Sequence, residues 1–213
     1  MTPLSNFIKI KKEISELSIN TKIIVVSKTF DINDIYPIIN YGHFDFGENR
    51  VQEAKLKWSN LLVKNPSINL HLIGNLQSNK AKEAVNIFNF IHTLSSEKLA
   101  KILKNEQEKI NKKIKYFIQV NISDENQKNG IELSSANDFI KFCIHDLSLQ
   151  IIGLMCLPPV NDTPDFYFTK LRKIATENNL SILSMGMSND YVSAIRIGST
   201  HVRIGSKIFG NRY

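Results

Sequence analysis

The segment KIIVVSK (residues 22–28) contains four consecutive apolar residues, Ile23 to Val26, followed by Ser27 and Lys28. Strands that are apolar at consecutive positions are typical of a parallel sheet covered on both faces. Seven further short runs are rich in apolar and β-branched residues: HFDFGE (43–48), NLHLIG (69–74), FIHTL (90–94), KYFIQVNI (115–122), LQIIGLMCL (149–157), SILSMGM (181–187) and THVRIGS (200–206). The sequence therefore predicts eight strands.

Amphipathic patterns between these runs predict helices. Three stripes of apolar residues recur at helical spacing: Val51, Ala54, Trp58, Leu61 and Leu62; Leu99, Ile102, Leu103 and Ile110; Tyr167, Leu171, Ile174 and Ala175. Asn49 and Gln52 predict a capping box, and Thr163 followed by Pro164 predicts a helix start. An additional helix over 4–17 precedes the first strand.

Eight strands separated by helices, without a break in composition, predict a (β/α)₈ TIM barrel that forms a single domain over residues 1–213. The strand starts run from residue 22 to residue 200 and are about 25 residues apart on average. A chain of 213 residues is short for this fold, so we expect the last helix to be short or absent. The alternative is an open, doubly wound sheet. No GxGxxG turn follows the first strand, which counts against it.

Composition narrows the function classes. The chain is 42% hydrophobic and 22% charged, as expected of a globular protein. It has neither an apolar run long enough to span a bilayer nor the continuous apolar block of a secretory signal, so we expect a cytoplasmic protein. The two cysteines, Cys143 and Cys156, lack the spacing of a disulfide framework or metal site, and we expect no metal.

A net charge of +7 raises the question of nucleic-acid binding. Only five of the 27 basic residues are arginines, and the other 22 are lysines spread over predicted helix faces. We therefore interpret the charge as a solvated surface and expect neither nucleic-acid nor membrane binding.

Candidate site residues follow the predicted strands, because TIM barrels place their active sites at the carboxyl ends of the strands. Lys28 ends an apolar run, and an amine in dry surroundings has a lowered pKa and can form a Schiff base with an aldehyde. A lysine whose charged end reaches solvent is the alternative. Ser188 is predicted to cap a helix over 189–196, and the amides of Gly205 and Ser206 could bind an anion. Together these residues predict a phosphate site, with ordinary helix capping as the alternative.

Arg203 is predicted to point into the barrel, because its neighbours Val202 and Ile204 should face the helices. A buried guanidinium requires an acceptor, and a pyridine nitrogen would serve.

The segments VVSKT, FGENRVQEA, HLIGNLQSNKAK, IQVNIS, GLM and LSMGMSNDYVSAIRIGSTHVRIGSKIFGNR resemble those of the pyridoxal phosphate homeostasis proteins. That family is similar to the barrel domain of alanine racemase and lacks its second, β-rich domain. The resemblance covers nearly the whole chain. It implies pyridoxal 5'-phosphate (PLP) as cofactor, held as an aldimine on Lys28, with Ser188, Gly205 and Ser206 on the phosphate, Arg203 near the pyridine nitrogen and Asn49 near the ring. Phe30, Cys156 and Leu70 depart from the family pattern.

Two functions are compatible with this resemblance: a PLP carrier that takes part in vitamin B6 homeostasis, and a PLP-dependent amino-acid racemase. A racemase of this type needs an acid/base group opposite the lysine. Tyr41 and Tyr213 have no clear placement, and His43 and His201 lie at strand beginnings. We therefore predict a carrier without robust racemase activity and with no catalytic residue. We expect it to be a monomer that could pass PLP to apo-enzymes.

The segment from His71 to Lys80 is the remaining motif. Gln77, Asn79 and Lys80 either line the rim or belong to a strand end and helix cap. His71 and His92 are predicted to be structural residues of the barrel.

Overall fold

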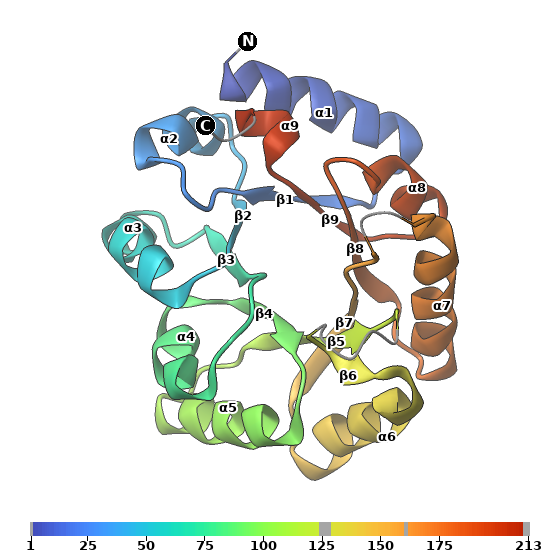
Figure 1. Ribbon diagram of the computed structural model, residues 1–213. Coiled ribbons are helices and arrows are strands. Elements are labelled where there is room, and N and C mark those ends of the chain that lie inside the picture. Colours follow the sequence, from blue (N-terminus) through green and yellow to red (C-terminus); the bar gives the residue numbers. More distant parts are fainter. Residues whose placement is uncertain (1, 124–128, 160–161, 211–213) are drawn as a thin grey trace.

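The computed structural model describes residues 2–123, 129–159 and 162–210. Within these ranges, eight parallel strands form a closed ring in the order β1, β2, β3, β4, β5, β7, β8 and β9. The ring closes because β4 pairs with β5 and β1 pairs with β9. Figure 1 shows the strands as a ring with the helices outside it. This closure excludes the open doubly wound sheet and confirms the predicted TIM barrel.

The strands agree with the eight predicted runs, and most end one or two residues earlier. Their bounds are β1 Lys22–Val26, β2 Asp45–Glu48, β3 Asn69–Leu72, β4 Phe90–Leu94, β5 Lys115–Asn121, β7 Gln150–Met155, β8 Ile182–Met187 and β9 His201–Ile204. A short strand that the sequence did not predict, β6 (Ile131–Glu132), pairs with the end of β5.

Helices cover the outside of the ring. Their bounds are α1 Pro3–Leu17, α2 Ile32–Asn40, α3 Val51–Lys64, α4 Ala81–Ile87, α5 Glu97–Lys109, α6 Ala136–Lys141, α7 Pro164–Glu177, α8 Tyr191–Arg196 and α9 Ser206–Phe209. The predicted N-terminal helix is α1, which packs beside α9 (Figure 1). The last helix, α9, is four residues long, as the length of the chain predicted.

Helix starts were predicted with mixed success. Helix α7 begins at Pro164, as predicted. The capping box of Asn49 and Gln52 is wrong, because α3 begins at Val51 and its N-cap residue, Arg50, forms no side-chain cap.

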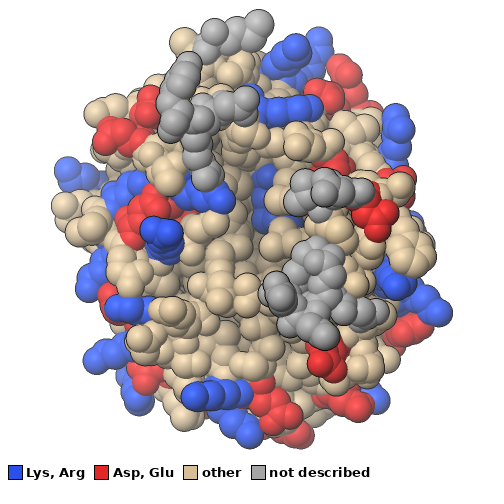
Figure 2. All heavy atoms as spheres, viewed as in Figure 1, with Lys and Arg blue, Asp and Glu red and all other residues tan. Residues whose placement is uncertain are grey.

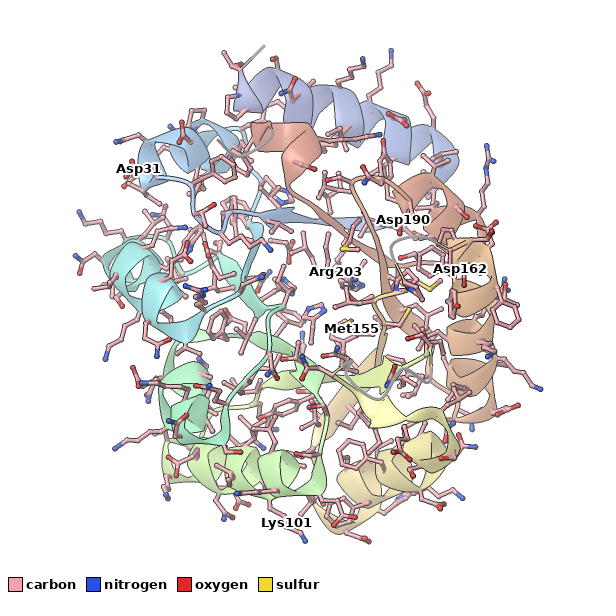
Figure 3. All side chains as sticks on the ribbon, in the orientation of Figure 1. Asp31, Lys101, Met155, Asp162, Asp190 and Arg203 are labelled. Carbon is pink, nitrogen blue, oxygen red and sulfur yellow. The ribbon has the colours of Figure 1, made fainter. Side chains whose placement is uncertain are left out.

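Strand alternation divides the buried residues into two groups. Outward-facing residues such as Val25, Leu72 and Ile204 pack against the helices in the large core. Phe90, Phe117 and Met155 form a smaller cluster inside the ring, and Figure 3 shows Met155 near the centre of the ring. The interior of the barrel is therefore filled, and open space remains at its ends.

Candidate functional site

A pocket of about 570 Å³ opens at the carboxyl ends of the strands. All six predicted site residues line it: Lys28, Asn49, Ser188, Arg203, Gly205 and Ser206. They follow or belong to β1, β2, β8 and β9, which the barrel brings to one mouth. Figure 2 shows a central hollow with basic side chains inside it, whereas acidic and basic residues are mixed around its rim.

Lys28 lies in the turn that follows β1 and lines this pocket together with Val26, the last residue of that strand. Lys28 is half-buried rather than surrounded by apolar groups. The expectation of fully dry surroundings is therefore too strong, although Val26 and Ile73 supply apolar lining.

The loop of Lys28 is held by side chains from α3. Lys57 Nζ donates a hydrogen bond to the carbonyl oxygen of Ser27 at 2.8 Å. On the other side of Lys28, the backbone N–H of Thr29 donates to Glu53 Oε1 at 2.5 Å. Thr29 has a φ of 68°, a left-handed conformation that a non-glycine residue adopts only with support from its surroundings. Both neighbours of Lys28 are thus fixed, which orients its backbone toward the pocket.

A buried carboxylate anchors this arrangement. Glu48 is fully buried, and its Oε1 accepts hydrogen bonds from Ser27 Oγ at 2.8 Å, Trp58 Nε1 at 2.9 Å and Lys57 Nζ at 3.0 Å. Burial raises the pKa of Glu48, and Lys57 opposes that rise. Sequence analysis missed this cluster. The signal was present, because Glu53 and Lys57 lie at helical i,i+4 spacing directly after a strand that ends in a glutamate.

Ser188 has a different role from the one predicted. It does not cap α8, which begins at Tyr191 with Asp190 as its N-cap residue. Instead, Ser188 Oγ accepts from the backbone N–H groups of Gly205 at 3.3 Å and Lys207 at 3.4 Å. A hydroxyl that accepts two hydrogen bonds still has its own hydrogen to donate. Ser188 therefore joins the end of β8 to α9 and can donate to an anion in the pocket.

Two glycines allow close backbone approach at the pocket. A Cβ at Gly205 would lie 3.2 Å from Val26 Cβ, and a Cβ at Gly74 would lie 2.2 Å from the backbone oxygen of Asn49. The absence of a side chain at Gly74 lets the end of β3 pack against Asn49, which lines the pocket.

Arg203 points into the barrel, as strand alternation predicted, and Figure 3 shows it near the centre of the ring. Its exposed fraction is 4%. Nη1 donates to the backbone oxygen and to Oγ of Ser184, both at 2.7 Å, and Nη2 donates to the backbone oxygen of Cys156 at 3.0 Å. Burial lowers the pKa of Arg203, but a guanidinium remains charged in this setting. The structure therefore presents a fixed cation at the base of the pocket.

The remaining candidates lie elsewhere. Lys80 forms an ion pair with Glu83, and neither it nor Gln77 nor Asn79 is among the residues that line the pocket. Tyr41 is exposed beside Phe7 and Lys11, and Tyr213 lies outside the described residues.

His71 and His92 are buried inside the barrel. Burial also raises the pKa of the thiols of Cys143 and Cys156 to about 12. Over the described ranges, no group of three or more His, Cys, Asp or Glu is arranged to hold a metal ion, and no helix is both long and apolar enough to cross a membrane.

Comparison with known proteins identifies relatives over nearly the whole chain. The family model of the alanine racemase N-terminal domain matches residues 4–212. The pyridoxal phosphate homeostasis protein of Pasteurella multocida is 39% identical over 201 residues, covering 90% of this chain and 86% of the relative. That of Aquifex aeolicus is 35% identical over 200 residues, covering 90% and 87%.

The chain is also similar in fold to proteins of known structure. PipY of Synechococcus elongatus PCC7942, solved with PLP bound, superposes with a TM-score of 0.88 at 30% identity and covers 98% of this chain and 100% of that chain. Alanine racemase of Clostridium difficile 630 shares the fold, with a TM-score of 0.75 at 11% identity over 94% of this chain and 55% of its own. The chain therefore belongs to the alanine racemase N-terminal domain family and, within it, to the pyridoxal phosphate homeostasis proteins.

Proposed function

We propose that the protein binds PLP in the pocket at the carboxyl ends of the strands and takes part in the homeostasis of this cofactor. It would hold PLP on Lys28 and release it to apo-enzymes. The observation that supports this function most directly is that an amine, a buried guanidinium and a hydroxyl with neighbouring amides line one pocket.

The residues of the pocket fit the aldehyde, the phosphate and the pyridine nitrogen of PLP. The cofactor supplies an aldehyde, with which the Lys28 amine can condense with loss of water. The hydroxyl hydrogen of Ser188 and the backbone N–H of Ser206 suit the phosphate, because hydroxyl and amide donors bind phosphate oxygens. The Gly205 N–H already donates to Ser188 Oγ, so Gly205 would contribute through the close approach that its missing side chain allows. Arg203 suits the pyridine nitrogen as a hydrogen-bond donor, and Asn49, which lines the same pocket, would lie beside the ring.

The charge of Arg203 is compatible with a carrier, although racemases of this barrel type tolerate the same partner. PLP stabilises a carbanion best when its ring nitrogen is protonated, usually beside a carboxylate. An arginine is a permanent cation and does not favour that proton. Held by Ser184 and Cys156, Arg203 cannot turn away from the pocket without breaking three hydrogen bonds.

The racemase alternative has less support. Among the described residues that line the pocket, the titratable ones are Lys28, Asp162, Asp190 and Arg203. Asp190 accepts a hydrogen bond from the Met187 N–H, and Asp162 accepts from the Thr163 N–H and the Tyr167 hydroxyl. Both carboxylates thus already accept hydrogen bonds from nearby groups of the protein. Neither is an obvious acid/base group opposite the lysine.

Trapping with borohydride tests the proposal. The purified full chain is mixed with PLP, the absorbance of the adduct is recorded, and the adduct is reduced and mapped by mass spectrometry. We expect one adduct, on Lys28, that is lost in Lys28→Ala. Lys22→Ala is the matched control, because Lys22 lies at the opposite end of β1 and is exposed. An adduct on another lysine, or none, contradicts the proposal.

The same preparation tests release and catalysis. We expect the loaded protein to reactivate an apo-form of a PLP-dependent enzyme and to show little racemisation of L- or D-alanine. As part of the same proposal, the protein works as a monomer in the cytoplasm. Sedimentation velocity and cell fractionation test these two points.

A further inference from the structure

A line of polar side chains crosses the interior of the barrel. His71 Nε2 lies 3.1 Å from Asp45 Oδ1, His71 Nδ1 lies 3.0 Å from His92 Nε2, and His92 Nδ1 lies 2.9 Å from Ser184 Oγ. Ser184 Oγ in turn accepts from Arg203 Nη1 at 2.7 Å. These contacts connect β2, β3, β4, β8 and β9.

The two ends of this line lie at opposite mouths of the barrel. Arg203 lines the pocket at the carboxyl ends of the strands. Asp45 lies at the start of β2, beside Lys22 and His43, and its side chain is 20% exposed. Apart from Asp45, the members of the line are almost fully buried. The contacts therefore connect the binding pocket to the opposite, solvent-facing end.

The chemistry at the two ends sets the direction of every hydrogen bond between them. An ionised Asp45 can only accept, so His71 carries its hydrogen on Nε2 and its Nδ1 accepts. His92 must then donate from Nε2 and accept at Nδ1, and the hydroxyl hydrogen of Ser184 points to His92. Arg203 can only donate, so Ser184 accepts from it. Every donor is matched to an acceptor when both histidines are neutral.

The surroundings of the two histidines support this assignment. Burial lowers the pKa of His71 and places the pKa of His92 well below its usual value, which keeps both rings neutral. The ring of His71 stacks on Phe90 with centroids 4.2 Å apart, and the ring of His92 stacks on Phe117 at 4.1 Å. Each imidazole is thus held in the orientation that its hydrogen bonds require.

We propose that Asp45, His71, His92 and Ser184 form a one-way hydrogen-bond relay that holds the Arg203 guanidinium in place and adjusts the charge it presents to the bound cofactor. Within a chain of this kind, each group that donates becomes a better acceptor, so Ser184 binds Arg203 more strongly because it donates to His92. The four residues are positioning residues that act through Arg203. The part that concerns the cofactor rests on the proposed PLP function.

Nitrogen NMR of the protein without cofactor tests the relay directly. Spectra of uniformly ¹⁵N-labelled protein at pH 7 are expected to show His71 and His92 as neutral rings with hydrogen on Nε2, and slowly exchanging Nη–H signals of Arg203. In Ser184→Ala the Arg203 signals should exchange faster and broaden. An imidazolium, an Nδ1–H tautomer at His71 or His92, or unchanged Arg203 signals in the variant would overturn the relay.

Substitutions at two buried serines test the effect of the relay on PLP binding. Ser184→Ala breaks the relay, whereas Ser199→Ala removes a similarly buried hydroxyl that donates to the Met185 carbonyl and lies outside it. We expect PLP to bind about tenfold more weakly to Ser184→Ala, the effect of losing one hydrogen bond to a charged group, and the absorption maximum of the lysine adduct to shift. Ser199→Ala should change neither the affinity for PLP nor the absorption maximum, even if the two variants lose similar amounts of folding stability.

Asp45→Asn provides a second comparison at a partly exposed position. Asparagine keeps an acceptor for His71 but removes the charge, so it should preserve the tautomers and shift the adduct spectrum less than Ser184→Ala does. Equal PLP affinity and equal spectra across the wild type and all three variants would show that the line of residues is merely structural. If the wild type took up no PLP, the proposed function would fail, and the NMR measurements would still decide the relay.

Discussion

The ammonium group of Lys57 lies at the centre of the buried cluster that holds the loop of Lys28. It contacts the carbonyl oxygen of Ser27 and the carboxylates of Glu48 and Glu53, and its side chain is 11% exposed. A buried ion pair adds little to the stability of the fold by its own attraction. Lys57 matters because, without it, the buried carboxylate of Glu48 would have no charged partner, and an unpaired buried carboxylate is strongly unfavourable.

Lys57→Met should therefore reduce the free energy of unfolding by about 3–5 kcal/mol, the usual effect of leaving one partner of a buried ion pair alone. Urea denaturation at pH 7 measures this change. The matched control is Lys55→Met on the same helix, where the side chain is 63% exposed and pairs with Glu83 at 3.7 Å. The control should change stability by about 0.5 kcal/mol or less. Equal effects of the two substitutions would rule out the structural role of Lys57.

At the scale of elements, the loop after β1 and the last helix meet through an aromatic pair. The rings of Phe30 and Phe209 stack with centroids 4.4 Å apart and an interplanar angle of 20°. Phe30 lies two residues after Lys28, and Phe209 ends α9, whose first turn lines the pocket. The pair thus connects the proposed aldehyde and phosphate ends of the site, and it explains the hydrophobic residue at position 30 in structural terms.

A double-mutant cycle with Phe30→Ala and Phe209→Ala measures this contact. We expect a coupling energy of about 0.5–1.5 kcal/mol in the free energy of unfolding, the range found for aromatic pairs. The single variants should also bind PLP a few-fold more weakly, because the two parts of the site lose their connection. Phe30→Tyr keeps the ring and serves as the control. Strictly additive effects of the two alanine substitutions would show that the rings do not interact.

For the molecule as a whole, closing the barrel buries His71, His92 and His201 and partly buries His43 near its amino-terminal end. Burial lowers the pKa of His43, His71 and His92, and lowers that of His201 to about 3. In the unfolded chain these groups take up protons near their ordinary pKa of about 6.5. Below that pH the unfolded state binds more protons than the folded state, so acid favours unfolding.

We therefore expect the free energy of unfolding to fall as the pH is lowered from 7 to 5, with each of these histidines contributing up to about 1.4 kcal/mol per pH unit. Urea denaturation at half-unit steps of pH measures the slope. His92→Phe should make the slope shallower by the contribution of one histidine. A stability that stays constant or rises over this range would contradict the buried, neutral state of these rings.

The ring of eight strands, the N-terminal helix and the short last helix could all be predicted from the sequence, because they depend on local alternation, helical spacing and chain length. The strand-end rule and strand alternation also identified five residues that line one pocket, because parallel strands bring their carboxyl ends together, and the family resemblance added Asn49. Local patterns were insufficient to predict the roles of polar residues near helix starts, because such a residue can either cap the helix or face another part of the fold. Ser188 binds the amides after β9 instead of capping α8, and Asn49 lines the pocket instead of capping α3.

The pairing of the buried polar groups, in contrast, depends on the three-dimensional fold. His92 and Ser184 are 92 residues apart, and nothing in either segment predicts that they share a hydrogen bond. The same holds for Glu48, whose partners come from the loop after β1 and from α3. A buried polar group requires a partner, but barrel closure determines which partner is within reach, and closure depends on all eight strands at once.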